Sequence, residues 1–547
     1  MGFFGLGVIP GLSWLQRLSL GLLVSTMVSG GPLLAAERLS VRFGELERSV
    51  SVKELAVFAS TGQSEGGLSW YLDRLRPAER LDLRRALSMG APFSSLMLSQ
   101  ALAAPIGQEV IAQLAKALAL PAPVAQSALE AALVLGAAPT GRLSLIHVLE
   151  AFPLRDLPVD GRMVMAVVRE ISHAFDERNK LYPGLVALDG GAPLASPLVQ
   201  PNLTSLAKAG PAAFTRQPFR YMGRYGKTVQ AVLYLPAQAT AKTKAPLVVL
   251  APGLDNDFNA LLYLAQHLAS HGYGVATLNF PFTSSNAIGG ALMGSSPIPP
   301  PGAWFGQPRS VSDLIDQVQQ RWGTRIDTTL VGALGQSLGG YTVTALGGAR
   351  LDWAHLQASC KTVADSKHVV LNLAMLWQCQ DPEKAVTEPD QSDPRVKAVV
   401  AVNPVTNPIF SAKSLGAIST PMLFIAGTHD IFAPPISQQV GPFTSLKQPG
   451  RMVAVVDGAT HLSFLDGSKP LPVFLVGPDR PEAYQELKGL SLAFFDQYLL
   501  GGQLLNQLVP AAGGIQRGGA PLTMLLRRQL SMAEVFAALE PLAPPSP

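Results

Sequence analysis

A serine between two glycines, in residues 335–339, is where residue types and spacing most clearly indicate chemistry. The five residues are Gly335, Gln336, Ser337, Leu338 and Gly339. The pattern G-x-S-x-G places its serine on a sharp turn between a strand and a helix, with the hydroxyl exposed at the edge of a sheet. Glycines are needed there because larger side chains would collide with the neighbouring strand and helix. Residues 328–334 are typical of a buried strand and residues 340–346 can continue as a helix, so we predict that Ser337 is a nucleophile.

A nucleophilic serine needs a base and an acid, and candidates for both follow it in the chain. One arrangement of such a triad has the chain order serine, aspartate or glutamate, histidine. The hydrophobic segment 421–427 ends at a turn that carries Asp430, and the segment 452–456 ends at a turn that carries His461. We predict Asp430 as the acid that orients the imidazole and His461 as the general base. The alternatives are a loop cap for Asp430, a surface histidine for His461, and His429 as the base.

Attack on a carbonyl develops negative charge on its oxygen, and two backbone N–H groups can hold that charge in an oxyanion hole. One candidate is the amide of Leu338, directly after the serine. The second donor belongs to the loop after an earlier strand. Residues 246–251 are typical of such a strand, and Pro252-Gly253-Leu254-Asp255 is its loop. We therefore predict the Leu254 amide as the second donor.

Together with a further strand at residues 396–402, these segments resemble the α/β hydrolases related to platelet-activating-factor acetylhydrolase and dienelactone hydrolase. The N-terminal half resembles the helical domain of unknown function that precedes such a hydrolase in a family typical of cyanobacteria. The resemblance implies an α/β-hydrolase fold, with a mostly parallel central sheet and helices on both faces, plus an N-terminal all-helical domain. It also implies an esterase or lipase, whose natural substrate the resemblance does not supply.

The sequence departs from these relatives in the loop after the strand at 246–251. The relatives usually read His-Gly-Leu-Gly, whereas this chain reads Pro-Gly-Leu-Asp at residues 252–255. A carboxylate that pointed into an oxyanion hole would oppose the developing charge. We expect instead that Asp255 or Asp257 caps the helix that follows.

The order of these segments predicts five regions. They are a signal peptide at 1–36, a helical domain at 37–188, a linker at 189–218, a catalytic domain at 219–500 and a C-terminal tail at 501–547. Arg17 precedes the apolar run 18–28, and small residues follow up to Ala36, as in a cleavable export signal. We therefore predict export to the periplasm or the extracellular space, with an uncleaved membrane anchor as the alternative.

The chain contains two cysteines, Cys360 and Cys379. Both lie in the insertion 347–392, at a place where related folds often carry a lid. In an exported protein they could form a disulfide that closes a loop of about twenty residues. Two buried free thiols are the alternative.

Composition and motifs exclude several classes of function. The net charge of +4 is small for 547 residues and no basic stripe is interleaved with aromatics, so nucleic-acid binding is not expected. The chain has neither an H-E-x-x-H motif nor paired C-x-x-C motifs, so we expect no metal and no cofactor. Charged residues make up 15% and hydrophobic residues 48%, which suits a well-buried enzyme acting on an ester or a lipid. Peripheral contact with a membrane stays open, and the oligomeric state is not specified.

Two other classes of function remain open beside the esterase or lipase. One is an acyltransferase or peptidase that uses the same triad. The other is an envelope binding protein in which the hydrolase site is vestigial.

Overall fold

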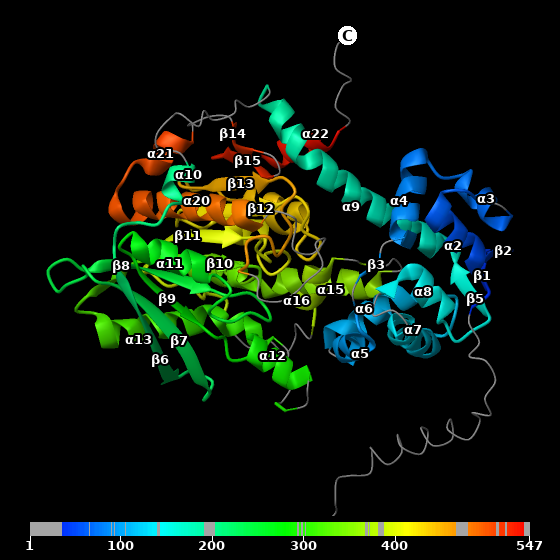
Figure 1. Ribbon diagram of the computed structural model, residues 1–547, viewed down its shortest axis with the longest axis horizontal. Helices are drawn as coiled ribbons and strands as arrows, with labels where there is room; N and C mark the ends of the chain where they lie inside the picture. Colours follow the sequence, from blue (N-terminus) through cyan, green and yellow to red (C-terminus); the bar gives the residue numbers. More distant parts are fainter. Residues whose placement is uncertain are drawn as a thin grey trace, which may run out of the picture.

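The computed structural model describes residues 36–540, apart from residues 65, 89, 92, 104, 139–142, 191–202, 293–294, 297–298, 301, 367–369, 371, 381–387, 467–479, 510–513 and 520–521. A larger domain surrounds a ten-stranded sheet, and a smaller N-terminal domain lies beside it (Figure 1). The long helix α9 (Gly161–Leu188) runs from the smaller domain onto the larger one. The predicted signal peptide lies outside the described residues apart from Ala36, as do residues 191–202 of the predicted linker.

The ten strands of the large sheet follow the order β14-β15-β13-β12-β11-β10-β8-β9-β7-β6. The six strands from β9 to β13 in this order are mutually parallel, and their bounds are β8 Ala245–Ala251, β9 Gly274–Leu278, β10 Ile326–Gln336, β11 Val396–Val402, β12 Met422–Gly427 and β13 Met452–Val456. Antiparallel strands complete both edges, and these are β6 Phe214–Met222, β7 Thr228–Pro236, β14 Gly514–Gly519 and β15 Leu522–Arg527. The central strands are nearly continuous runs of valine, leucine and alanine, as expected for parallel strands buried on both faces.

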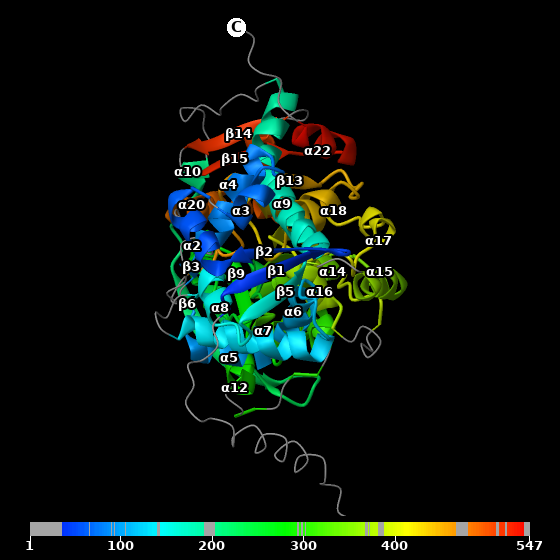
Figure 2. The same cartoon turned by 90° about the vertical axis from the view of Figure 1, so that its right-hand side faces the viewer.

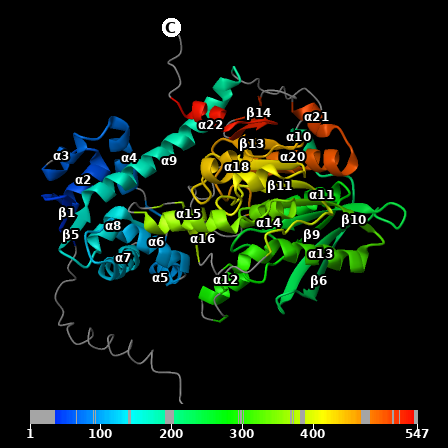
Figure 3. The same ribbon diagram turned by 180° about the vertical axis from the view of Figure 1, so that it is seen from behind.

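Helices cover both faces of this sheet, and the sheet separates two hydrophobic cores. One core contains residues of α13 (Gln307–Trp322) and α14 (Leu338–Leu346). The other contains residues of α11 (Leu262–Ser270) and α20 (Arg480–Leu500). Figures 1 and 3 show the molecule from these two sides. The prediction of a mostly parallel sheet with helices on both faces is confirmed.

The remaining helices of this domain are short or lie in its connections. Their bounds are α10 Leu203–Leu206, α12 Ser285–Leu292, η1 Ala303–Gly306, α15 Trp353–Asp365, α16 Leu373–Gln378, α17 Ala412–Gly416, η3 Pro435–Val440, α18 Gly441–Phe443, α21 Leu504–Leu508 and α22 Met532–Leu539.

The prediction of an all-helical N-terminal domain is wrong, because this domain also contains two small sheets. Three strands pair in the order β2-β1-β5, and β3 pairs with β4; their bounds are β1 Arg38–Phe43, β2 Leu46–Ser51, β3 Gly90–Ala91, β4 Leu143–Ser144 and β5 Asp156–Asp160. The helices, which face the viewer in Figure 2, are α2 Val52–Thr61, α3 Gly67–Leu72, α4 Pro77–Ser88, α5 Ser95–Ala103, α6 Pro105–Ala115, α7 Ala122–Ala137, α8 Leu145–Glu150 and the first part of α9. The strands are short and largely exposed, so they lack the hydrophobic run that marks a buried strand.

The expected C-terminal tail is in part a piece of the large sheet. Strands β14 and β15 extend this sheet beyond β13, and α22 packs against α9. Without β15, strand β13 would leave a row of backbone groups unpaired at the sheet edge. The glycines of β14 conceal this strand in the sequence, because glycine is depleted in strands. The large domain therefore extends from Phe214 past the expected boundary at Leu500.

Among the described residues, no helix combines the length and the apolar character that crossing a membrane requires.

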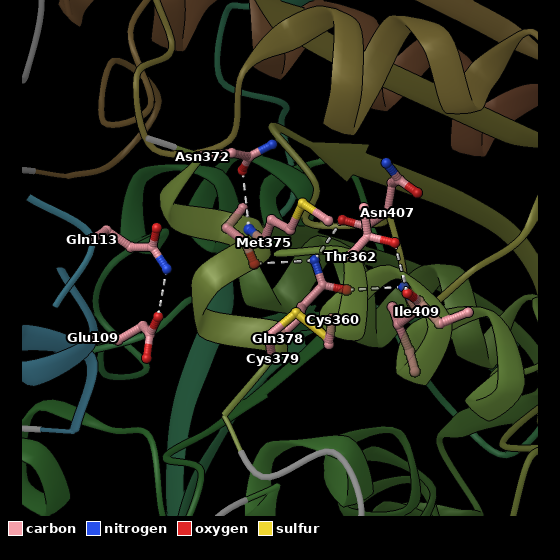
Figure 4. Close-up of a disulfide and its surroundings, with 12 residues drawn as sticks. Glu109, Gln113, Cys360, Thr362, Asn372, Met375, Gln378, Cys379, Asn407 and Ile409 are labelled. Carbon is pink, nitrogen blue, oxygen red and sulfur yellow. Dashed lines mark hydrogen bonds between the residues drawn. A yellow bond between two sulfur atoms is a disulfide. The ribbon is translucent and has the colours of Figure 1, made fainter. Parts of the chain in front are cut away.

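Cys360 and Cys379 form the predicted disulfide, which joins α15 to the end of α16 (Figure 4). Next to it, the buried Gln378 side chain donates to the carbonyl of Asn407 and accepts from the amide of Ile409. The disulfide thus joins two helices within the inserted segment, and Gln378 fixes this segment to the loop that follows β11.

Replacing both cysteines by serine is expected to lower the free energy of unfolding by about 3 kcal/mol, since the bridge constrains a loop of about twenty residues in the unfolded chain. Urea denaturation followed by circular dichroism measures this change. A reducing agent should destabilise the parent protein by a similar amount and leave the doubly substituted protein unchanged. Equal midpoints for the two proteins under oxidising conditions would contradict the expectation.

Candidate active site

Ser337 lies at the turn between β10 and α14, in a backbone conformation that is rare for a residue with a side chain. Its φ is 59° and its ψ is −118°. A non-glycine residue in such a region costs on the order of 1–3 kcal/mol, so the surrounding structure must hold it. The Ser337 amide donates to the carbonyl of Val402 (2.9 Å), and the Ser337 carbonyl accepts from the amides of Tyr341 (3.1 Å) and Val405 (3.3 Å).

The two glycines of the motif are required by close backbone contacts. A Cβ atom at Gly335 would lie 2.1 Å from the carbonyl oxygen of Gly339, and one at Gly339 would lie 1.9 Å from that of Ala251. No side chain fits at either position. The sharp turn that the sequence pattern predicts is therefore present. The close backbone contacts explain why both flanking positions are glycines.

The structure brings Ser337, His461 and Asp430 into one line of hydrogen bonds. His461 Nε2 lies 2.7 Å from Ser337 Oγ, and His461 Nδ1 lies 2.7 Å from Asp430 Oδ2. A carboxylate can only accept, so Nδ1 carries the proton and donates to Asp430, which leaves Nε2 free to accept the serine proton. Ser337 is 8% exposed, so the triad lies just below the surface.

The carboxylate of Asp430 is fixed by four donors. Its Oδ1 accepts from the amides of Phe432 (2.9 Å) and Ala433 (2.8 Å). Its Oδ2 accepts from Gln439 Nε2 (2.8 Å) as well as from His461. The side chain is completely buried. The carboxylate therefore has one orientation available, the one that holds the imidazole.

The imidazole that contacts the serine is that of His461, and His429, the alternative base, contacts a different hydroxyl. Its Nδ1 lies 2.9 Å from the hydroxyl of its neighbour Thr428. Burial lowers the pKa of His429 to about 4, and the positive charge of Arg178 adds to this effect. A histidine with this pKa is a weak base at neutral pH.

The two amides expected to form the oxyanion hole lie at the serine turn. Leu338 is the first residue of α14, and amides in the first turn of a helix have no acceptor within the helix and lie at its positive end. The loop that carries Leu254 is pressed against the same turn, because a Cβ atom at Gly253 would lie 3.2 Å from Ser337 Cβ. Both amides are thus placed near Ser337, and their role in holding an oxyanion stays a prediction.

The expectation that Asp255 or Asp257 caps the following helix is wrong, because α11 begins only at Leu262 and its N-cap is Leu261, which makes no side-chain cap hydrogen bond. The Asp257 carboxylate accepts from the amide of Asn259 (2.7 Å) in the turn that precedes this helix. Asp255 has a φ of 55°, its amide donates to the carbonyl of Thr283, and its carbonyl accepts from the hydroxyl of Ser285. The loop after β8 is thus anchored to the segment that begins α12.

Three buried glutamine and asparagine side chains around the triad escaped the sequence analysis. These are Gln336, Asn403 and Gln439, each with no exposed surface. Gln336 and Asn403 donate to the carbonyl of His461, and Gln439 donates to Asp430. The only signal in the sequence is the position of Asn403, directly after a buried strand at the edge where the triad loops meet.

The insertion with the disulfide lies over the acid loop. The ring of Phe432 packs 5.4 Å from the His461 ring, and the Phe432 carbonyl accepts from the amide of Ala374 in α16. The N-terminal domain contacts the same insertion, since Lys116 donates to the carbonyl of Ser366 (3.2 Å). The insertion is therefore held between the N-terminal domain and the triad.

A cavity of about 500 Å³ lies at the same edge of the sheet as Ser337. It is formed where β9 ends and β7 begins, and Lys227, Asn279, Phe282 and Asn286 are among its lining residues. Its wall includes Ser284, which lies between the two residues that anchor the loop after β8. The cavity is thus connected to the loop after β8 through Ser284, and neither this loop nor the triad belongs to its described lining.

Within the described ranges, no group of three histidine, cysteine, aspartate or glutamate side chains could hold a metal ion. The chemistry that the arrangement of Ser337, His461 and Asp430 can perform requires only these protein groups.

A comparison with protein families gives a match. A family model described as alpha/beta hydrolase of unknown function (DUF1400) matches residues 35–160, which belong to the N-terminal domain. No curated protein matches the chain. The narrower likeness to platelet-activating-factor acetylhydrolase and dienelactone hydrolase stays a prediction. The chain thus has the α/β-hydrolase fold in its larger domain and, over its N-terminal domain, is similar to a family of α/β hydrolases whose function is unknown.

Proposed function

We propose that the protein is a serine hydrolase that cleaves carboxylic esters, of the esterase or lipase type. The observation that carries this proposal is the line of two 2.7 Å contacts that joins Asp430, His461 and Ser337. A serine hydroxyl is a weak nucleophile unless a base takes its proton, and this geometry provides such a base together with the group that orients it.

The first half of the reaction forms an acyl-enzyme. His461 Nε2 takes the Ser337 proton as Oγ attacks the ester carbonyl carbon, and the Leu254 and Leu338 amides hold the negative charge on the carbonyl oxygen. Asp430 keeps the proton on Nδ1 and stabilises the imidazolium. His461 then gives its proton to the leaving alcohol, and the bond between the carbonyl carbon and the alcohol oxygen breaks.

The second half repeats these steps with water. His461 takes a proton from a water molecule, whose oxygen attacks the acyl-enzyme. The carboxylic acid leaves as Ser337 Oγ recovers its proton from His461. In an acyltransferase an alcohol would replace this water, and in a peptidase an amine would leave in the first half.

Export is part of the proposal. The disulfide between Cys360 and Cys379 supports an oxidising compartment, such as the periplasm or the extracellular space. An ester or a lipid outside the cytoplasm is then the substrate class, and the cavity beside the loop after β8 is a candidate site for its polar part.

A fluorophosphonate probe tests the proposal directly. Incubation with the purified full chain should give one adduct per molecule, located at Ser337 by peptide mass spectrometry, because the probe reacts with activated serines. Heat-denatured protein should not react. Folded protein that shows no adduct would favour the alternative of a binding protein with a vestigial site. Labelled protein that hydrolyses no p-nitrophenyl ester would direct the search to other acyl donors and acceptors.

A further inference from the structure

Asn403 occupies a position between the loops that carry the triad. It directly follows β11, which lies between β10, the strand before Ser337, and β12, the strand before Asp430. Asn403 is 0% exposed and has a φ of 43°. Asparagine tolerates this left-handed conformation better than most residues with a side chain. The chain therefore turns directly after β11, and this turn buries the polar side chain of Asn403 at the edge of the sheet where the triad lies.

Both the Nδ2 and the Oδ1 atom of Asn403 bond to the segments that carry His461 and Asp430. Its Nδ2 donates to the carbonyls of Thr460 (3.1 Å) and His461 (3.2 Å). Its Oδ1 accepts from the amide of Gly427 (3.1 Å), three residues before Asp430. The preceding residue, Val402, accepts from the Ser337 amide. This short segment thus contacts all three parts of the chain that supply the triad.

Gln336 adds a second donor to the same backbone position. Its Nε2 donates to the His461 carbonyl at 2.8 Å. A carbonyl oxygen has two lone pairs, and Gln336 and Asn403 together can occupy both. Two completely buried side chains, those of Gln336 and Asn403, therefore restrain the backbone at His461.

Resting on the proposed esterase function, we propose that Asn403, assisted by Gln336, is a positioning residue that holds the catalytic histidine in register with Ser337 and Asp430. The His461 imidazole must bond to Ser337 and to Asp430 at the same time. Catalytic side chains that act together have to stay within about 0.5 Å of their productive positions. Backbone hydrogen bonds at His461 restrict the movement that would lengthen both contacts. Asn403 does not touch the reacting atoms, so its effect passes through His461.

Two variants of Asn403 test this role. Asn403→Gly keeps the backbone conformation and removes the amide. Asn403→Asp keeps an acceptor for Gly427 but turns a carboxylate oxygen towards two carbonyl oxygens, which repel it. Both variants are expected to lower kcat about a hundredfold, the loss typical of a misplacement of about 1 Å, and to leave KM for a p-nitrophenyl ester within about twofold.

A matched control separates positioning from general loss of stability. Gln448 is also a buried amide, and its Nε2 donates to the carbonyl of Thr420 (3.1 Å), outside the triad. Gln448→Ala should lower the midpoint of thermal unfolding much as Asn403→Gly does, while its kcat stays within about twofold of the parent value. If Asn403→Gly keeps the kcat of the parent protein, the proposal is wrong.

Proton NMR provides a readout that does not depend on turnover. The proton between His461 Nδ1 and Asp430 should give a resonance far downfield, which should weaken or move upfield in Asn403→Gly and stay unchanged in Gln448→Ala. If the parent protein shows this resonance but hydrolyses no ester, the proposed function is wrong. The positioning role can still be measured from the resonance in that case. An unchanged resonance in Asn403→Gly would refute the positioning role alone.

Should the Asn403 variants fail to fold, Gln336→Met decides the question. Methionine is close in size to glutamine and cannot donate to the His461 carbonyl. The proposal expects a fall in kcat of about tenfold, smaller than for Asn403 because one donor remains. An unchanged kcat with an unchanged downfield resonance would refute the proposed restraint on His461.

Discussion

Replacing Ser337 by alanine is expected to lower ester hydrolysis on the order of a million-fold, the scale of loss when a triad serine is removed. The hydroxyl supplies the atom that forms the acyl-enzyme, and His461 alone cannot substitute for it. The strained backbone at this position is held by hydrogen bonds of the main chain, which alanine keeps. Turnover of p-nitrophenyl esters, measured beside circular dichroism and thermal unfolding, checks both parts of this expectation.

A buried serine outside the site provides the control for this experiment. Ser491 lies in α20, has no exposed surface, and donates to the carbonyl of Leu487. Ser491→Ala should retain full activity and fluorophosphonate labelling. Substantial turnover in folded Ser337→Ala would remove the nucleophile from the mechanism and with it the acyl-enzyme.

Replacing Asp430 by asparagine is expected to lower kcat on the order of ten-thousand-fold while KM changes little. An asparagine amide at the position of Oδ2 would face two donors, His461 Nδ1–H and Gln439 Nε2. The imidazole can avoid this conflict by moving its proton to Nε2, where it can no longer accept the proton of Ser337. The opposite orientation would face the amides of Phe432 and Ala433 in the same way. Steady-state kinetics with short-chain esters measures the loss.

Asp393 offers a comparison for the effect of neutralising a buried carboxylate. It is paired with Arg395 (2.7 Å) and takes no part in the triad. Asp393→Asn should lower stability and leave kcat close to that of the parent protein. If the Asp430→Asn variant retains a tenth or more of the parent kcat, the orientation of His461 does not depend on the Asp430 carboxylate.

The placement of the three triad residues could be anticipated from the sequence for a simple geometric reason. The carboxyl ends of parallel strands meet at one edge of a sheet, so residues that follow β10, β12 and β13 come together there even though more than a hundred residues separate Ser337 from His461. Each strand is recognisable by itself, because a strand buried on both faces is a continuous hydrophobic run. The glycines at 335 and 339 mark the turn independently.

The features that the sequence did not reveal depend on contacts between distant segments. Strand β1 pairs with β5, more than a hundred residues away, and its exposed face carries charged residues. The glycine-rich strand β14 becomes a strand because β15 lies beside it. Asn403 and Gln336 are ordinary polar residues in the chain, and their role appears only when the His461 carbonyl is seen to accept from both. Local patterns cannot supply such information.

The packing of α22 against α9 has a consequence for the order in which the molecule can be completed. Gly184 of α9 approaches the backbone of α22 so closely that a Cβ atom would lie 2.0 Å from the carbonyl oxygen of Ala538. Strand β15 (Leu522–Arg527) likewise follows α9 and all six parallel strands in the order of the chain. A nascent chain in which residues 522–539 have not yet been synthesised therefore lacks both the strand that pairs with β13 and the helix against which α9 packs. The contact between α9 and α22 can form only after synthesis has passed α22.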